Sequence, residues 1–281
     1  MLRLGLAIIV LCAGVSGVWI ERSTWRPEPE VAFLAVGQGD CTVIRFGNSA
    51  ILVDVGPRNP YTDAGERIVA PELRRMGVTS VPLILLTHPD SDHIGGIKAM
   101  MRAYPRARVA TPAHFRANPN FVTALREAGV DADRVDWLEK ESLVSFGPFR
   151  LRLASPDADP TTSTNDGSLF VRVQAPGYAV VLSGDATIPV ENAMARRGAW
   201  NAEILQLGHH GSRTSTGAAW LSAVKPELAV ASAGRDNRYG HPHASVVNAL
   251  EERGIRLLRT DRHGTITVRP SARGYEVVVS R

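Results

Sequence analysis

The sequence predicts an α+β protein with four layers, in which two β-sheets lie face to face and helices cover their outer sides. The main observation is that the chain consists of two successive halves, each combining short apolar strands with helices. The composition agrees, because 44% hydrophobic and 21% charged residues are typical of a globular protein. A chain of 281 residues can form one large domain. We therefore expect a single αββα sandwich over residues 31–281, and we exclude disorder, collagen and coiled coil.

The chain begins with a segment directed to a membrane. Leu4 to Ile20 carry no charge and follow Arg3. Seventeen residues are at the short limit for a spanning helix, and the small residues around Val15 and Gly17 also suit a signal-peptidase site. We therefore expect residues 1–20 to be a signal peptide or a membrane anchor, and the polar residues 21–30 to be a linker. With Arg3 inside, the domain is expected outside the cytoplasmic membrane, as a secreted, periplasmic or anchored protein.

The first half of the domain opens as a meander of strands. Alternating or apolar runs end at Gly-containing turns. Asp63 can cap a helix that stops before Gly77, and Asn118-Pro119 begins a helix that ends near Gly129. We expect strands over 31–36, 41–46, 49–55 and 81–88, and helices over 64–76, 97–104 and 118–129.

The second half returns to short strands and then alternates them with helices. Pro189 stands in the first turn of one predicted helix, where proline is tolerated. We see no repeat of fixed period. We expect strands over 134–139, 142–146, 149–154, 168–175, 178–184, 202–208, 227–233, 255–260, 264–270 and 275–280, and helices over 188–197, 218–224 and 244–253.

Cysteine content and charge limit the kinds of site that are possible. The 2 cysteines, Cys12 and Cys41, cannot form a disulfide framework or a cysteine zinc site, so stability must come from a hydrophobic core. The net charge of +4 belongs to the globular part, because the first thirty residues hold three Arg and three Glu. This basic excess is compatible with a polyanionic substrate, but it does not establish one.

The chemistry is concentrated in a loop that follows the strand predicted over 81–88. His88, Asp90, Asp92 and His93 lie within six residues, and a tight loop can direct them to one point. Two such close carboxylates repel each other unless a cation offsets their charge. A polar turn in which Asp92 caps the next helix is the simpler alternative. A metal site is favoured because residues of types that bind metals also stand directly after other predicted strands. These residues are Asp185 in LSGDAT and the pair His209-His210 in LGHHGS.

These motifs resemble a known family. The pattern H-x-D-x-D-H at His88–His93 resembles the H-x-H-x-D-H motif of the metallo-β-lactamase superfamily. More narrowly, residues 31 to about 270 resemble the C-terminal metallo-β-lactamase-like domain of the ComEC competence proteins. Seven motifs carry this resemblance in order: Val36–Asp40, Leu52–Gly56, the His88 loop, Asn165–Leu169, Ser183–Asp185, Gly208–Ser212 and Tyr239–Pro242.

The resemblance implies two divalent metal ions, Zn²⁺ or Mn²⁺, held between the two sheets. His88 and Asp90 would hold one ion, Asp92 and His93 the other, and Asp185 would bridge them. The last histidine of the family maps onto His209 or His210. We expect His210 to be the ligand, and His209 to face the substrate as proton donor or oxyanion stabiliser.

Two departures from the wider superfamily affect the choice of metal. Asp90 stands where a histidine is usual, and the third-motif histidine is absent, with Asn165 as its nearest counterpart. The first site therefore has fewer nitrogen ligands, and oxygen-rich sites favour Mn²⁺ or Mg²⁺ over Zn²⁺.

Several other residues are open to two interpretations. Asp40 and Asp54 either form turns or orient the metal histidines, and for Asp54 we favour the second role. His241 either reaches the scissile group or lies on a surface loop. Ser212 either caps a turn or contacts a phosphate.

Asp166 should border the site without holding metal, and His114, His243 and His263 lack a matching motif and should be structural or exposed.

The resemblance implies a metal-dependent phosphodiesterase, in other words a nuclease for DNA, with catalytic roles for His209, His241 and Asp92. The alternatives are a hydrolase of another phosphodiester or ester, such as a cell-envelope phosphocholine group, and a DNA-binding module without catalysis. A single hydrophobic segment cannot form a DNA channel. We expect a stand-alone secreted or anchored relative of the DNA-uptake proteins, with a piece of a longer protein as the other possibility.

Overall fold

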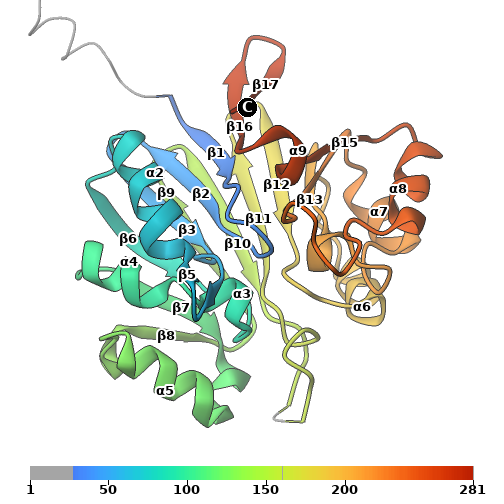
Figure 1. Ribbon diagram of the computed structural model, residues 1–281. Helices are drawn as coiled ribbons and strands as arrows, with labels where there is room; N and C mark the ends of the chain where they lie inside the picture. The colour runs from blue at the N-terminus through green and yellow to red at the C-terminus, as the bar shows by residue number, and fades with distance from the viewer. Residues whose placement is uncertain (1–27, 160, 281) are drawn as a thin grey trace, which may run out of the picture.

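The computed structural model describes residues 28–159 and 161–280, and these form an αββα sandwich (Figure 1). One sheet has eight strands in the order β17-β16-β1-β2-β3-β6-β7-β8, and the other has seven in the order β15-β14-β13-β12-β11-β10-β9. In Figure 1, α2, α4 and α5 lie on one flank and α6, α7 and α8 on the other. The four layers predicted from the sequence are confirmed.

The elements follow the predicted order with a few additions. The first half contains β1 Glu30–Phe33, β2 Thr42–Phe46, β3 Ser49–Val53, β4 Arg58–Asn59, β5 Thr62–Asp63, the π-helix η1 Gly65–Val69, α2 Ala70–Arg75, β6 Ser80–Leu85, α3 Ser91–Ile94, α4 Ile97–Ala103, β7 Arg108–Pro112, the 3₁₀-helix η2 Ala113–Ala117, α5 Pro119–Glu127, η3 Ala132–Arg134 and β8 Val135–Leu138. The second half contains β9 Glu141–Phe146, β10 Phe149–Ala154, β11 Phe170–Ala175, β12 Tyr178–Leu182, α6 Ile188–Arg197, β13 Ile204–Gln206, η4 Gly208–Gly211, α7 Ala218–Val224, β14 Leu228–Ala231, α8 Ala244–Glu251, β15 Arg256–Arg259, α9 Thr260–His263, β16 Ile266–Ser271 and β17 Gly274–Val279.

Each interface between layers has its own apolar core. Leu73, Met100 and Phe121 belong to the cluster beneath the helices of the first sheet. Phe33 and Leu151 belong to the cluster between the two sheets. A third cluster lies between the second sheet and its helices, and it includes Phe170, Trp200 and Trp220. Strands buried on both faces read as continuous apolar runs, which is why these segments were recognisable from the sequence.

Local signals lie at the predicted helix starts, although the helix predicted over 64–76 is divided into the π-helix η1 and α2. The side chain of Asp63 accepts a hydrogen bond from the Glu66 backbone N–H at 3.1 Å. Asn118 likewise accepts from the Phe121 N–H at 3.1 Å and caps α5, with Pro119 in the first turn. The two side-chain oxygens satisfy donors that the first turn of a helix leaves free.

Several features differ from the sequence-based expectation. The strand β7 was missed, because its short run RVATP contains a proline and lacks clear alternation. The metal-motif loop contains a helical turn, α3. The segment expected to be linker up to residue 30 ends one residue earlier, since Glu30 lies in β1 and its buried carboxylate pairs with Arg45 at 2.7 Å and Arg269 at 2.8 Å.

The predicted targeting segment, residues 1–20, lies outside the described residues. Among residues 28–159 and 161–280, no helix combines the length and apolar character needed to span a bilayer.

Candidate metal centre

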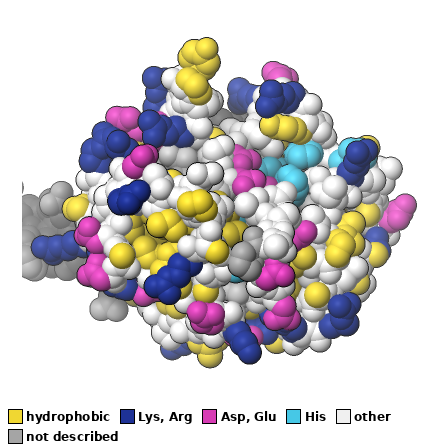
Figure 2. All heavy atoms as spheres, turned by 90° about the horizontal axis from the view of Figure 1, so that it is seen from below, with side chains coloured by type: hydrophobic (Ala, Val, Ile, Leu, Met, Phe, Trp, Pro, Cys, Tyr) yellow, Lys and Arg dark blue, Asp and Glu magenta, His cyan; other side chains and the backbone are white. Residues whose placement is uncertain are grey.

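Polar side chains gather where four strands end, at the junction of the two sheets. Asp54 follows β3, His88 follows β6, Asp185 follows β12, and the pair His209-His210 follows β13. Because β3 is parallel to β6 and β12 is parallel to β13, these carboxyl ends meet at the same edge of the sandwich. Figure 2 shows histidine side chains beside acidic ones on this face, with Lys and Arg side chains scattered around them.

Four side chains present ligand atoms to one point. Asp92, His93, Asp185 and His210 each offer a nitrogen or oxygen atom, and these atoms lie within 4.8 Å of one another. His93 Nε2 is 3.2 Å from Asp185 Oδ1, and His210 Nε2 is 3.2 Å from Asp92 Oδ2. Only the Asp92 side chain, 34% exposed, opens this group to solvent. The arrangement has the ligand types and spacing of a site for one divalent cation.

A second group faces the other oxygen of Asp185. His88 Nε2 is 3.8 Å from Asp185 Oδ2 and 3.9 Å from Asp90 Oδ2. His209 Nε2 is 3.5 Å from the same Asp185 Oδ2. His210 Nε2, from the first group, is also 3.9 Å from Asp185 Oδ2. Asp185 therefore lies between the two groups of side chains, and its Oδ2 contacts members of both.

Asp54 fixes the orientation of the histidines from behind. Its Oδ2 is 2.8 Å from His93 Nδ1 and accepts a hydrogen bond from the Thr87 hydroxyl at 2.8 Å, and its Oδ1 accepts from the Thr87 N–H. The Thr87 oxygen is in turn 3.0 Å from His88 Nδ1. Since the Thr87 proton goes to Asp54, this oxygen can accept the Nδ1 proton of His88. Both histidines then have Nε2 free as a ligand atom.

Asp40 has a comparable position behind His210. Its Oδ1 is 3.6 Å from His210 Nδ1, and its side chain is almost fully buried. The preceding residue, Gly39, has a φ of +149°, and a Cβ atom there would collide with the Asp92 carbonyl oxygen. Only glycine permits this close approach of the Gly39 backbone to the metal-motif loop.

The backbone at the histidine pair is strained. His209 and His210 have φ of 50° and 58°, in the left-handed region, as does Asp54 with φ of 59°. Non-glycine residues rarely adopt this conformation, and it is concentrated at functional sites. The turn directs His210 into the buried group, whereas His209 keeps 28% of its side chain exposed.

The charges of the buried groups depend on one another. Burial by itself would raise the pKa of Asp185, but His93, His210 and His88 beside it hold that pKa well below its usual value. Burial opposes the charge of His210, yet Asp185 and Asp40 raise its pKa to about 10. His88 differs, because burial and the neighbouring His93 lower its pKa to about 4. Protons on His93 and His210 thus offset the buried carboxylates, and a bound cation would replace them.

The donor set fits divalent cations. Within the described part of the chain, His88 Nε2, His93 Nε2 and Asp185 Oδ1 are buried and lack any hydrogen-bond partner. Burying such atoms unpaired is costly, and metal coordination is a common way to satisfy them.

His241 lies at the open side of the centre. Its ring centroid is 5.8 Å from that of His209 and 6.3 Å from that of His210. Burial first, and then repulsion by these two histidines, lowers the pKa of His241 to about 4. The exposed ring of Tyr239 stacks on His241 at 5.7 Å.

The remaining residues named from the sequence lie around the centre or away from it. Asp166 accepts a hydrogen bond from the Thr187 hydroxyl, two residues after Asp185. The Ser212 hydroxyl lies 2.9 Å from that of Thr214, in a turn. Asn165 makes no side-chain hydrogen bond within the described residues, and its backbone carbonyl accepts from the Ser168 N–H.

The histidines expected to be structural lie outside the centre. His243 caps α8 through the Ser245 N–H, and His263 contacts the backbone of Arg259. His114 packs on Phe115 with a centroid distance of 4.1 Å.

Two contributors were not singled out from the sequence. Thr87 links Asp54 to His88, and its position directly before the first motif histidine was the only signal. The Ser168 hydroxyl accepts a hydrogen bond from the Asp185 N–H at 3.2 Å, and Ser168 belongs to the quoted Asn165–Leu169 motif.

With fold and site described, the chain can be classified. Residues 34–235 match the metallo-β-lactamase superfamily, and the chain belongs to this superfamily. The metal motif and the αββα sandwich found above agree with that membership. Similar folds also occur among solved structures: CmlA, a diiron β-hydroxylase from Streptomyces venezuelae, superposes with a TM-score of 0.59 at 15% identity, covering 86% of this chain and 54% of that chain.

Curated relatives at about 30% identity align with most of this chain. ComE operon protein 3 of Bacillus subtilis (strain 168) is 30% identical over 86% of this chain and 33% of its own length. Competence protein ComA of Neisseria gonorrhoeae is 32% identical over 92% of this chain and 35% of its own length. The chain thus spans about a third of the length of these relatives.

Proposed function

We propose that this protein is a metal-dependent phosphodiesterase that cleaves nucleic acid, in particular DNA, outside the cytoplasmic membrane. The central observation is Asp185, whose carboxylate lies between two groups of ligand types, with His93 Nε2 3.2 Å from Oδ1 and His88 Nε2 3.8 Å from Oδ2. Phosphodiester cleavage is typical chemistry for a pair of cations held close together. The similarity to proteins named for competence supports DNA as the substrate. The position outside the membrane rests on the sequence of residues 1–20.

The two cations would share Asp185. His88 and Asp90 would hold the first, and Asp92, His93 and His210 would hold the second. When bound, two such cations supply Lewis acidity and a water of lowered pKa at neutral pH. Asp90 contributes oxygen where nitrogen is usual, so we propose Mn²⁺ beside Zn²⁺ as candidate metals.

The protein's own side chains would orient the metal ligands and hydrogen-bond the substrate. Asp54, directly and through Thr87, holds the rings of His93 and His88. His209 is partly exposed with Nε2 3.5 Å from Asp185, so it can face a bound phosphodiester as proton donor. His241, a neutral imidazole at neutral pH because of its lowered pKa, can hydrogen-bond the leaving oxygen. The Asp92 side chain lies at the open side of the centre, where it is partly exposed to solvent and next to the proposed second cation.

Metal analysis combined with a substrate panel tests this proposal. The purified protein should bind close to two equivalents of Mn²⁺ or Zn²⁺ and should cleave at least one of plasmid, linear duplex and single-stranded DNA. Cleavage should weaken steeply as salt rises, because a protein releases counterions when it binds nucleic acid. A hydrolase of a small phosphodiester or ester would respond little to salt. Retention of DNA with no cleavage in any metal would indicate the binding module.

The sharpest single substitution is Asp185→Asn. An amide is neutral and bridges two cations poorly, so this variant should lose at least one metal equivalent and nearly all phosphodiester cleavage while staying folded. The matched control is Asp166→Asn, which removes the same charge next to the site and should keep both metals. Metal content by atomic spectroscopy decides the assignment. Two metals and a normal rate in Asp185→Asn, or a metal-free Asp166→Asn, would contradict it.

A further inference from the structure

A second concave site lies on the other side of the metal-motif loop. This pocket of about 480 Å³ is bounded by α3, α4, α5 and β4. Pro89 and Ser91, which alternate with His88, Asp90 and Asp92 in the motif, form part of its wall. Its volume falls within the range of about 300–1,000 Å³ that is usual for small-molecule sites.

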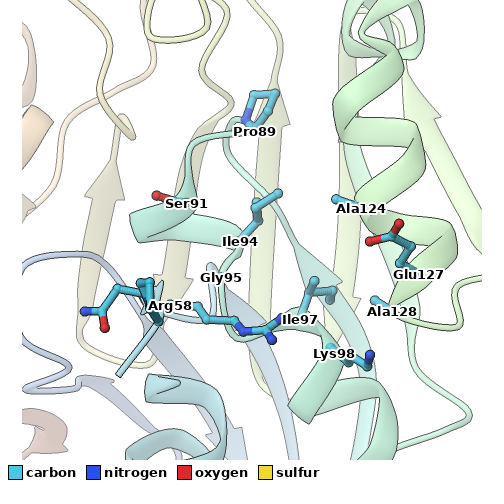
Figure 3. A pocket seen from close by; sticks show the side chains of 12 residues that line it. Arg58, Pro89, Ser91, Ile94, Gly95, Ile97, Lys98, Ala124, Glu127 and Ala128 are labelled. Carbon is cyan, nitrogen blue, oxygen red and sulfur yellow. The ribbon is translucent and has the colours of Figure 1, made fainter. Parts of the chain in front are cut away.

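The single turn of α3 separates the pocket from the metal centre. Ser91 and Ile94, three residues apart, face the pocket (Figure 3). Asp92 and His93, between them, point to the opposite side, where they meet Asp185 and His210. Residues three apart share one face of a helix, so one turn contributes to both sites. The two sites therefore lie on opposite sides of one helical turn.

The walls of the pocket combine an apolar surface with separate charges. Ile94 and Ile97 on one side and Ala124 on α5 supply apolar surface, and the side chains of Arg58, Lys98 and Glu127 surround it (Figure 3). Lys98 has no ion-pair partner within the described residues. Arg58 has only Asp63 at 3.7 Å, and its own side chain is 55% exposed. Both cations are therefore available to an anionic ligand.

We propose that this pocket binds an unpaired nucleotide next to the scissile phosphodiester, so that the substrate is a single-stranded nucleic acid. Arg58 and Lys98 would contact its phosphate, and the apolar wall would contact the face of the base. This inference rests on the proposed function, because it extends the same substrate across α3.

The Glu127 side chain favours a nucleotide over a simple anion as the ligand of this pocket. A carboxylate at the wall repels a second phosphate inside the pocket, but it can accept a hydrogen bond from the exocyclic amino group of a base. Single-strand binding sites combine cations for the backbone with a surface for the face of the base, and in this pocket that surface is aliphatic. A base can enter such a pocket only when it is not stacked in a duplex. These features favour an unpaired strand over a duplex.

Binding measured without metal tests the pocket separately from catalysis. The full chain in EDTA is titrated with a fluorescein-labelled oligodeoxycytidine, and anisotropy gives Kd. In Arg58→Ala/Lys98→Ala, Kd should rise about tenfold, and the slope of log K against log salt should become shallower by about 0.7 for each phosphate that the protein no longer neutralises. Ala124→Leu fills the pocket without changing charge, and it should raise Kd for the single strand about tenfold while leaving a duplex of the same length unaffected.

The control variant removes two cations elsewhere. Arg196 at the end of α6 and Arg253 after α8 are exposed, and Arg196→Ala/Arg253→Ala should keep the wild-type Kd.

The outcomes separate the two proposals. A Kd for Arg58→Ala/Lys98→Ala no higher than that of the control, or equal effects of Ala124→Leu on single strand and duplex, would overturn the nucleotide pocket. If the wild-type protein hydrolysed no phosphodiester in any metal, the proposed function would fail, yet the anisotropy result would still decide the pocket.

Discussion

At the scale of single residues, the orientation of the histidines depends on carboxylates outside the group formed by Asp92, His93, Asp185 and His210. Asp54 accepts hydrogen bonds from His93 Nδ1 and from Thr87, and it holds a left-handed backbone conformation to do so. Asp40 also lies behind His210, with its Oδ1 3.6 Å from His210 Nδ1, but these two atoms form no hydrogen bond. Hydrogen bonds such as those of Asp54 set the tautomer and the angle of a ligating ring.

Asp54→Asn should therefore weaken metal binding without destroying the fold. The amide cannot accept from His93 and Thr87 as the carboxylate does, and mutation of such an outer partner typically costs about 10–100-fold in metal affinity. Competition with a chelator of known affinity measures the change. Asp63→Asn, which keeps its helix-capping oxygen, serves as control. An unchanged metal affinity in Asp54→Asn would show that the carboxylate only forms the turn.

His241→Ala tests a group at the open side of the centre. We expect a lower kcat with metal content near the wild-type value, because the ring is 5.8 Å from His209 by centroid and lies outside the buried ligand group. Removal of one hydrogen-bonding group near a leaving oxygen typically costs about 10²–10⁴-fold in rate. Loss of a metal equivalent in this variant would instead identify His241 as a ligand.

At the scale of elements, the loop that carries the histidine pair is attached to α6 by a buried carboxylate. Glu191 is fully buried and accepts hydrogen bonds from the Thr216 and Gly217 N–H groups at 2.9 and 2.8 Å. The Ser215 hydroxyl in the same loop donates to the Gly208 carbonyl. The helix thereby positions the start of α7 and the turn that precedes it.

Glu191 should make stability depend on pH. Burial raises its pKa from 4.5 to about 7, against the opposing effect of the two N–H groups. The folded state therefore binds this proton more tightly than the unfolded state, so its stabilising contribution is full below pH 4.5 and is lost as pH rises to about 7. The loss is on the order of 3 kcal/mol.

Glu191→Gln removes this titration and keeps the shape of the neutral carboxyl group. Urea unfolding from pH 5 to pH 8 should show the variant gaining stability relative to the wild type as pH rises. A constant difference between the two proteins across this range would contradict the raised pKa.

At the scale of the whole molecule, the packing of the two sheets brings the two halves of the site together. Asp54, His88 and His93 come from the first sheet and its loops, and Asp185 and His210 from the second. The apolar cluster between the sheets holds these strands in register. Loosening that cluster should therefore affect both stability and metal binding.

Leu151→Ala and Leu143→Ala compare buried and exposed positions on neighbouring strands. Leu151 on β10 is fully buried between the sheets, so its truncation should lower the free energy of unfolding by about 2–5 kcal/mol. Leu143 on β9 is 80% exposed, and its truncation should change that free energy by less than about 0.5 kcal/mol. Equal losses would mean that β9 and β10 pack differently from the description above.

The sequence by itself determined the layer architecture and indicated the candidate ligands. Apolar runs, capping residues such as Asn118 and polar motifs at strand ends are local signals, because they act between residues close along the chain. They predicted most element boundaries, although the short proline-containing β7 was missed, and they named as candidate ligands the four residues whose side chains the structure brings together, Asp92, His93, Asp185 and His210.

Only the tertiary structure decided which side chains meet. It directed His210 into the buried group and left His209 partly exposed, although the two are adjacent in the sequence. It placed Asp54 against His93, 39 residues away, and brought Thr87 into the same network. It also formed the pocket between α3 and α5, for which the sequence had no signal. These interactions depend on strand register and on the packing of one layer against another, and no local pattern specifies them.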